Sequence, residues 1–169
     1  VRLVGSEMCI RDRLETATIE NSKNTGNVIG STNIGGIAGE SKGTITQCRN
    51  DGQVSKVVGV ICKTVNLGGL VGKNGEAARL SNSKNYGNVN SETDTLVNLG
   101  GICGILYNNS IVELCENNGA ISGSGKEIIP NEDTNTNCAS CTSNNGGSAS
   151  TDDFGQLNIG IIYGKYQEI

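Results

Sequence analysis

Cysteine and carboxylate side chains are the groups whose spacing could support chemistry here, because the 169-residue sequence has 7 Cys and 17 acidic residues but no His. Cys138 and Cys141 form a Cys-x-x-Cys pair, which provides only two of the four ligands of a structural zinc site. A thioredoxin-like role would need a βαβ context that the neighbouring sequence lacks. We expect a local disulfide or two free thiols, and an exported protein would favour the disulfide.

Residues 131–137 alternate oxygen-bearing side chains, as calcium loops do, and Asp152 and Asp153 follow in the same segment. The run lacks the Gly and the closing Glu of an EF-hand loop, so we expect a solvated polar loop, with calcium the one metal to test. The absence of His excludes His-Glu-x-x-His zinc sites, Ser-His-Asp triads and Cys-His dyads. We therefore assign no catalytic, cofactor-binding or metal-ligating residue and expect neither a cofactor nor enzymatic activity.

The composition limits both the core and the partners. Four Tyr, one Phe and no Trp cannot supply a large aromatic core, so short aliphatic strands must form it. The net charge of -4 gives a nucleic-acid role no electrostatic support. No apolar run approaches membrane-spanning length.

Two motifs alternate along the chain and predict a repeat architecture. The first has the pattern aliphatic-x-x-[Ser/Cys]-x-Asn-x-Gly-x-[Val/Ile] and occurs at 19–28, 45–54, 80–89 and 112–121. The second has the pattern Asn-aliphatic-Gly-Gly-aliphatic-x-Gly and occurs at 33–39, 66–72 and 98–104, with a looser copy at 158–164. Repeats therefore start at residues 19, 45, 80 and 112.

Each repeat is expected to supply three short strands that are not stable alone. Stacking the repeats at about 4.8 Å pairs equivalent strands in parallel and buries a continuous core. We predict an all-β fold, a parallel β-solenoid of about four coils over residues 14–164 with loop insertions, the largest at 122–157. A right-handed three-sided β-helix is the favoured form, and a flatter two-sheet roll is the alternative. Residues 165–169 are expected to be a truncated tail.

Stacking would place equivalent side chains in ladders. An Asn ladder is expected at the first turn, with each amide bonding the coil above and below, and a Gly ladder with positive φ one turn position later. The expected inward aliphatic ladders are Ile19, Ile45, Leu80 and Val112, and Val28, Val54, Val89 and Ile121. The expected Asn ladder is Asn24, Asn50, Asn85 and Asn117, and the Gly ladder is Gly26, Gly52, Gly87 and Gly119.

The repeat alignment also explains the other candidate residues. Cys48 and Cys115 stand where other repeats have Ser, and Cys103 stands where they have Ala or Val, so we expect small core residues. Cys62 lies in a loop insertion. Glu20 and Glu113 share one outward position but are three coils apart, roughly 14 Å, which is too far for paired-carboxylate chemistry. Tyr86 and Tyr107 look isolated. The outward position is occupied by Glu20, Thr46, Ser81 and Glu113.

Residues 1–13 share nothing with the repeats and resemble the translation of a transposase sequencing adapter. We therefore leave residues 1–13 out of the fold prediction. The alternative is a genuine N-terminal arm. The resemblance implies that the chain is a fragment from a sequencing read.

The alternation of Asn-x-Gly-x-Val with Gly-Gly-Leu-x-Gly resembles the GLUG repeat of bacterial surface and secreted proteins, over about residues 19–164. That resemblance implies an extracellular or cell-surface location. It also implies a non-catalytic stalk or adhesive scaffold that binds a host or surface glycan or protein and adjoins further repeats. The alternative is an accessory region of a secreted peptidase, similar to immunoglobulin A peptidases, or of a carbohydrate-active enzyme whose catalytic domain lies elsewhere. Unpaired strand edges at both ends predict self-association.

Overall fold

The structure is a computed structural model that describes residues 13–14, 17–60, 62–91, 96–107, 109–130, 138–139, 141–144, 147–160 and 163–167. Side chains are described for 17–60, 62–91, 96–107, 109–124 and 141–144. Every regular element in these ranges is a β-strand, and the strands form four sheets. No helix in this part of the chain has the length and apolar character needed to cross a membrane.

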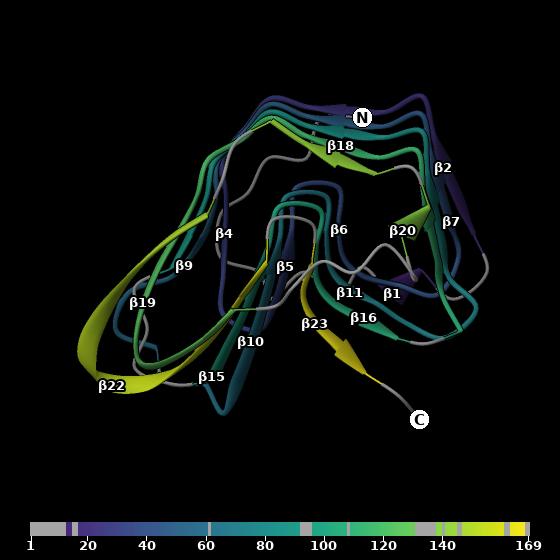
Figure 1. Cartoon of the computed structure of the whole chain (residues 1–169). Helices are drawn as coiled ribbons and strands as arrows, with labels where there is room; N and C mark the ends of the chain where they lie inside the picture. The colour runs from purple at the N-terminus through teal and green to yellow at the C-terminus, as the bar shows by residue number, and fades with distance from the viewer. Residues whose placement is uncertain are drawn as a thin grey trace.

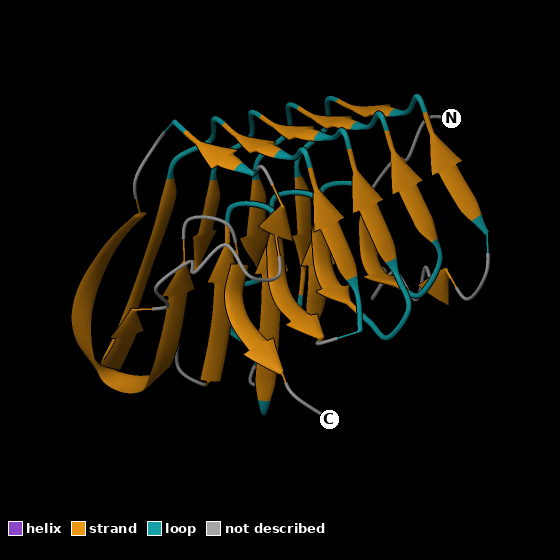
Figure 2. Cartoon of the chain, turned by 45° about the vertical axis from the view of Figure 1, so that its right-hand side comes forward, coloured by secondary structure: helices purple, strands orange, loops and turns teal. Residues whose placement is uncertain are grey.

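The sheets collect equivalent strands of successive repeats (Figures 1 and 2). Sheet 1 has the order β2 (Thr18–Glu20), β7 (Thr44–Thr46), β12 (Arg79–Ser81), β17 (Ile111–Glu113), β20 (Cys138–Ala139). Sheet 2 has the order β21 (Thr142–Ser143), β18 (Glu116–Asn117), β13 (Lys84–Asn85), β8 (Arg49–Asn50), β3 (Lys23–Asn24). Sheet 3 has the order β4 (Val28–Gly30), β9 (Val54–Lys56), β14 (Val89–Ser91), β19 (Ile121–Pro130), β22 (Gly147–Gly160), β15 (Leu96–Gly100), β10 (Thr64–Gly68), β5 (Asn33–Gly35). Sheet 4 has the order β1 (Arg13–Leu14), β6 (Ala38–Ser41), β11 (Val71–Asn74), β16 (Cys103–Tyr107), β23 (Tyr163–Gln167).

Every pairing between described strands is parallel, which confirms the predicted all-β class and the parallel pairing of equivalent strands. The register matches the motif alignment: Ile19 pairs with Ile45, and Val28 pairs with Val54. Residues of both inward ladders in the second and third repeats are fully buried. This architecture is consistent with a β-solenoid.

Each of the first three repeats contains five strands rather than the three expected. One extra strand arises because the first motif turns sharply at a residue with positive φ; the four such residues are Asn21, Gln47, Asn82 and Leu114, with φ of 49°, 53°, 49° and 52°. The other arises because the glycine motif bends after its first Gly and forms two strands, such as β5 and β6. The first motif and the glycine motif thus each contribute one more strand than predicted.

The glycine motif folds inward and divides the core. The bend between β5 and β6 and its equivalents reach toward sheet 2 (Figure 1). A Cβ at Gly36 would lie 2.2 Å from Asn50 Cγ, and a Cβ at Gly69 would lie 2.2 Å from Asn85 Nδ2, so only Gly allows this approach. One hydrophobic cluster lies on each side of the bend. The first is built around Ile45, Leu70, Leu80, Ile102 and Leu106, and the second around Val54, Val65, Leu67, Val89 and Leu99.

The predicted positive φ at the turn glycines is wrong, because in the described chain Gly59 is the glycine with positive φ. These turn glycines are required for close stacking instead. A Cβ at Gly87 would lie 1.8 Å from the carbonyl oxygen of Gly52, and a Cβ at Gly119 would lie 1.9 Å from that of Gly87. The Gly ladder therefore lets the turns of successive repeats touch through their backbones.

The fourth-repeat insertion contains more structure than a loop. After Asn117, the chain forms β19, and the later strands β20 and β21 pair with β17 and β18 as one further layer. The first part of β22 pairs with β19 from Ile121 onward, and its last part returns to β15, where Asn158 pairs with Asn98 as the motif alignment predicts. The candidate calcium segment 131–137 lies outside the described residues. Asp152 and Asp153 lie in β22, but their side chains are not described.

Candidate binding surface

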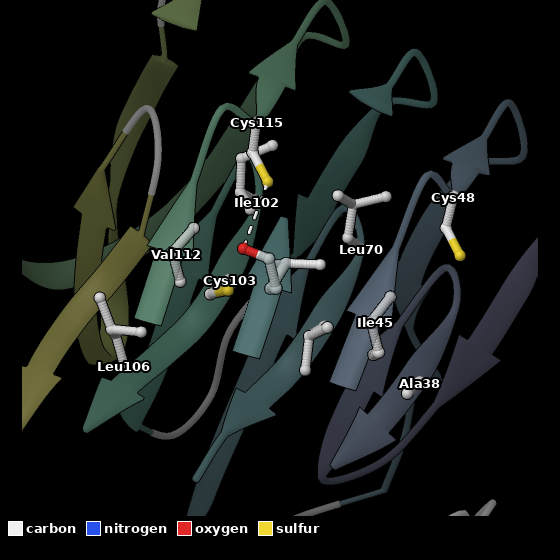
Figure 3. Packing of buried hydrophobic residues seen from close by; sticks show 11 residues of the cluster. Ala38, Ile45, Cys48, Leu70, Ile102, Cys103, Leu106, Val112 and Cys115 are labelled. Atoms are coloured by element: carbon white, nitrogen blue, oxygen red, sulfur yellow. Dashed lines mark hydrogen bonds between the residues drawn. The ribbon is translucent and has the colours of Figure 1, made fainter. Parts of the chain in front are cut away.

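The repeat-position cysteines are core residues. Cys48, Cys103 and Cys115 are buried free thiols that pack in the first hydrophobic cluster (Figure 3). Burial raises the pKa of the Cys115 thiol to about 11 and that of Cys103 well above its usual value. The Cys115 Sγ donates to backbone carbonyls, that of Glu113 at 3.3 Å and that of Leu80 at 3.8 Å. These thiols lack the exposed, electropositive surroundings of a nucleophile.

In the added layer, Cys141 takes the position of Cys48 and Cys115, and Cys138 takes the position of the inward aliphatic residue Val112. The backbone of Cys138 pairs with Val112, and Cys141 packs against the first hydrophobic cluster. Cys141 is disulfide-bonded, and its partner sulfur lies outside the described side chains. Cys62, in its loop, is a half-buried free thiol.

The position predicted to be outward in sheet 1 forms a row of equivalent residues, but it is not outward in every repeat, because Ser81 is only 4% exposed. Glu20, Thr46, Ser81 and Glu113 are in register, as predicted. Ser81 Oγ donates to Thr46 Oγ1 at 3.0 Å, and Arg79 forms an ion pair with Glu113. Among the described residues, no three His, Cys, Asp or Glu side chains are close enough to hold a metal ion.

The two tyrosines are not isolated, contrary to the expectation. The Arg49 guanidinium lies 4.2 Å from the centre of the Tyr86 ring, and the Lys73 ammonium lies 5.4 Å from the centre of the Tyr107 ring. Both pairs join successive repeats, so the repeat alignment could have suggested them. Each ring has a cation on one face, which reduces the area open to a sugar.

The outer face of sheet 2 is a network of paired charges. Asp51 accepts ion pairs from Lys23 at 2.8 Å and Arg49 at 2.5 Å, and hydrogen bonding to the Arg49 guanidinium lowers the pKa of that carboxyl. Lys84 pairs with Glu116 at 2.8 Å, which lowers the pKa of Glu116. This face is solvated, and both of these carboxylates are paired with cations.

The described connections between the outer strands β4 and β9 of sheet 3 and its inner strands β5 and β10 lie at one corner of the stack, together with the paired strands β19 and β22. We call this the loop corner, and its connections are residues 31–32, 57–60 and 62–63. The 57–63 segment, for example, joins β9, an outer strand of sheet 3, to β10, an inner strand of the same sheet. Because β9 pairs with β14 and β10 with β15, the ends of neighbouring segments are adjacent. Figure 1 shows β22 curving outward beside β19 at this side of the stack. Segment 92–95 lies outside the described residues.

The 57–63 segment presents an apolar tip. Val58 is 83% exposed and Val60 is 42% exposed. Gly59 turns the chain between them with φ of 82°, and a Cβ there would meet no atom within 4 Å. Exposed aliphatic side chains on a protruding turn are typical of contact residues rather than core residues.

Comparison with known proteins gives no relative: no family model, curated protein or solved structure matches this chain.

Proposed function

We propose that the chain is a β-solenoid segment of a bacterial surface or secreted protein of the GLUG-repeat type. It serves as a non-catalytic stalk or adhesive scaffold. The proposed finer architecture is a right-handed solenoid with three outer sides, sheet 1, sheet 2 and the outer half of sheet 3, into which the glycine motif folds. The parallel register of the motifs across four sheets supports this proposal. The disulfide at Cys141 supports an exported location.

The ligand is a host or surface glycan or protein, and it binds at the loop corner. The single observation that carries this assignment is the apolar tip, where Val58 is the most exposed large hydrophobic residue of the described chain and Val60 lies two residues away. In repeat proteins, insertions that gather on one face commonly form the binding surface. Burial of two valines on a partner contributes enough free energy to change affinity more than tenfold.

The test is binding of the chain to a printed glycan array and to immobilised collagen and fibronectin. The double variant V58S/V60S is expected to lose at least about tenfold in affinity for any ligand found. Ile111→Ser is the matched control, because Ile111 is a 47% exposed aliphatic residue in β17 of sheet 1, a different sheet from the strands that flank the tip. Equal binding by the double variant and the parent chain, or cleavage of the glycans or proteins, would contradict the proposal.

A further inference from the structure

The first repeat ends the stack with strands paired on one side. β2, β3, β4 and β5 are terminal strands in the described sheets 1, 2 and 3. In sheet 4, β6 is already followed by β1, since Arg13 pairs with Glu40. We call the surface made by β2, β3, β4 and β5 the first-repeat edge.

The inward aliphatic side chains at this edge are less buried than their counterparts in the next repeat. Ile19 and Val28 are half-buried, whereas their counterparts Ile45 and Val54 are fully buried. A Cβ at Gly26 would meet only Asn24 Oδ1, at 3.7 Å, among atoms outside its chain neighbours. At Gly52, by contrast, a Cβ would lie 1.9 Å from the Gly26 carbonyl oxygen. Among the described residues, therefore, no turn fills at the first repeat the space that the preceding turn fills at Gly52, Gly87 and Gly119.

The first Asn ladder has a direction. Asn24 Nδ2 donates to Asn50 Oδ1 at 2.8 Å, and the chain of amides continues through Asn85 to Asn117. Asn50 Oδ1 accepts two hydrogen bonds, one from Asn24 and one from the Gly52 amide at 3.2 Å. Asn24 Oδ1 accepts one, from the Gly26 amide at 3.1 Å. It therefore has room for a donor that approaches from the edge.

A second Asn ladder, which the sequence reasoning missed, has the opposite direction. Asn66 Nδ2 donates to Asn33 Oδ1 at 2.7 Å, and Asn98 Nδ2 donates to Asn66 Oδ1 at 2.6 Å. At the edge, Asn33 Nδ2 makes a long hydrogen bond of 3.4 Å to Glu40 Oε2. Asn33 therefore presents a donor that an incoming acceptor could satisfy better.

We propose that the first-repeat edge binds a solenoid turn of the same repeat pattern, presented in parallel, with Asn at both ladder positions. Such a turn supplies a donor above Asn24 and an acceptor above Asn33 in one register. Its glycine carbonyl fills the space beside Gly26, and its aliphatic residues cover Ile19 and Val28. The occupant therefore binds through the same contacts that join each repeat to the next.

The last layer of a second copy fits less well. It offers Ser143 rather than an asparagine at the first ladder position. At the second position it offers Ile129, which pairs with Asn158 and has no acceptor for Asn33. A turn with two asparagines is therefore the better occupant.

The experiment replaces residues 1–17 with a second copy of residues 44–78, so that the last strand of the copy takes the place of β1 beside β6. The junction is in register because Thr44 and Arg79 occupy the position of Thr18 in sheet 1. The extended chain is compared with the parent and with a control whose added copy carries Leu at the positions of Asn50 and Asn66. Backbone hydrogen exchange of β2, β3 and β4, thermal unfolding and sedimentation are measured.

The edge amides of the extended chain are expected to exchange at least tenfold more slowly than in the parent, and Tm is expected to rise. In the Leu control, both gains are expected to be lost, while the original Asn ladder from Asn24 to Asn117 stays protected. Equal exchange in the extended chain and the parent would overturn the proposal. Equal protection by the Leu control would also overturn it, because the ladders would then not select the occupant. Protection of the same amides by concentration-dependent dimerisation of the parent would identify a second copy as the occupant instead.

Discussion

Two asparagines with equal burial and unequal hydrogen bonding give the sharpest stability test. Asn74 and Asn85 are both fully buried. Asn85 makes four side-chain hydrogen bonds, to Gly87 twice and to the Asn residues of the two neighbouring repeats. Neither amide atom of Asn74 has a hydrogen-bond partner among the described residues. Burial without a partner costs an amide about 1–3 kcal/mol.

The substitution Asn74→Leu removes that cost at a position where the next repeat already has a leucine, since Asn74 pairs with Leu106. Overpacking offsets part of the gain, so we expect the free energy of unfolding to rise by about 1 kcal/mol. The substitution Asn85→Leu loses four hydrogen bonds at about 1 kcal/mol each and crowds Gly69, so we expect a loss of about 4 kcal/mol. The free energies of unfolding of the two variants should therefore differ by about 5 kcal/mol, although both variants replace a buried asparagine with leucine.

The assay is equilibrium unfolding in urea, read from the transition midpoint at constant slope. Asn74→Val is the smaller apolar control, which separates overpacking from removal of the amide. If both Asn74→Leu and Asn74→Val destabilise the chain by more than about 1 kcal/mol, the amide has a hydrogen-bond partner and the reasoning is refuted.

Three further predictions concern other parts of the fold. Leu114→Asn should raise the free energy of unfolding in urea by about 0.5–1 kcal/mol, because residue 114 has φ of 52°, which asparagine tolerates better than leucine. The Leu114 side chain is 54% exposed, so its removal loses little apolar burial. A lower free energy of unfolding would show that the leucine packs on a partner. At pH 8 in the native state, a maleimide should label Cys62 and leave Cys115 unlabelled until unfolding, because burial raises the Cys115 pKa to about 11; fast labelling of Cys115 would contradict its core assignment. The lowered pKa values of Asp51 and Glu116 stabilise the fold above the unfolded values of 3.8 and 4.5, so stability should fall as acidification passes through their folded pKa values. Glu116→Gln should flatten that fall at low salt, and an unchanged pH profile would refute the contribution.

Motif spacing predicted the features that depend on equivalent positions. The two inward ladders, the first Asn ladder and the buried Ser/Cys position follow from register alone, because parallel in-register stacking converts a sequence repeat directly into contacts. The same logic placed Asn158 beside Asn98, across an insertion. It could have identified the second Asn ladder, because Asn33, Asn66 and Asn98 recur at one motif position.

Features that depend on local backbone geometry could not be predicted in this way. The positive φ lies at Gln47 and Leu114 as well as at two asparagines, so residue type did not reveal the corner. The inward fold of the glycine motif depends on contact between Gly36 and Asn50, which belong to different motifs and different repeats. The layer formed by β20 and β21 carries no complete motif, and its pairing depends on edges supplied by the fourth repeat.

Parallel stacking of successive repeats through the Asn ladder can be observed directly by NMR of the side-chain amides. We expect nuclear Overhauser contacts between the Nδ2 protons of Asn24 and Asn50, Asn50 and Asn85, and Asn85 and Asn117. The buried amides of Asn50, Asn85 and Asn117 should exchange slowly. Contacts that join Asn50 to a residue outside its motif position, or fast exchange of the Asn50 and Asn85 amides, would contradict this stacking.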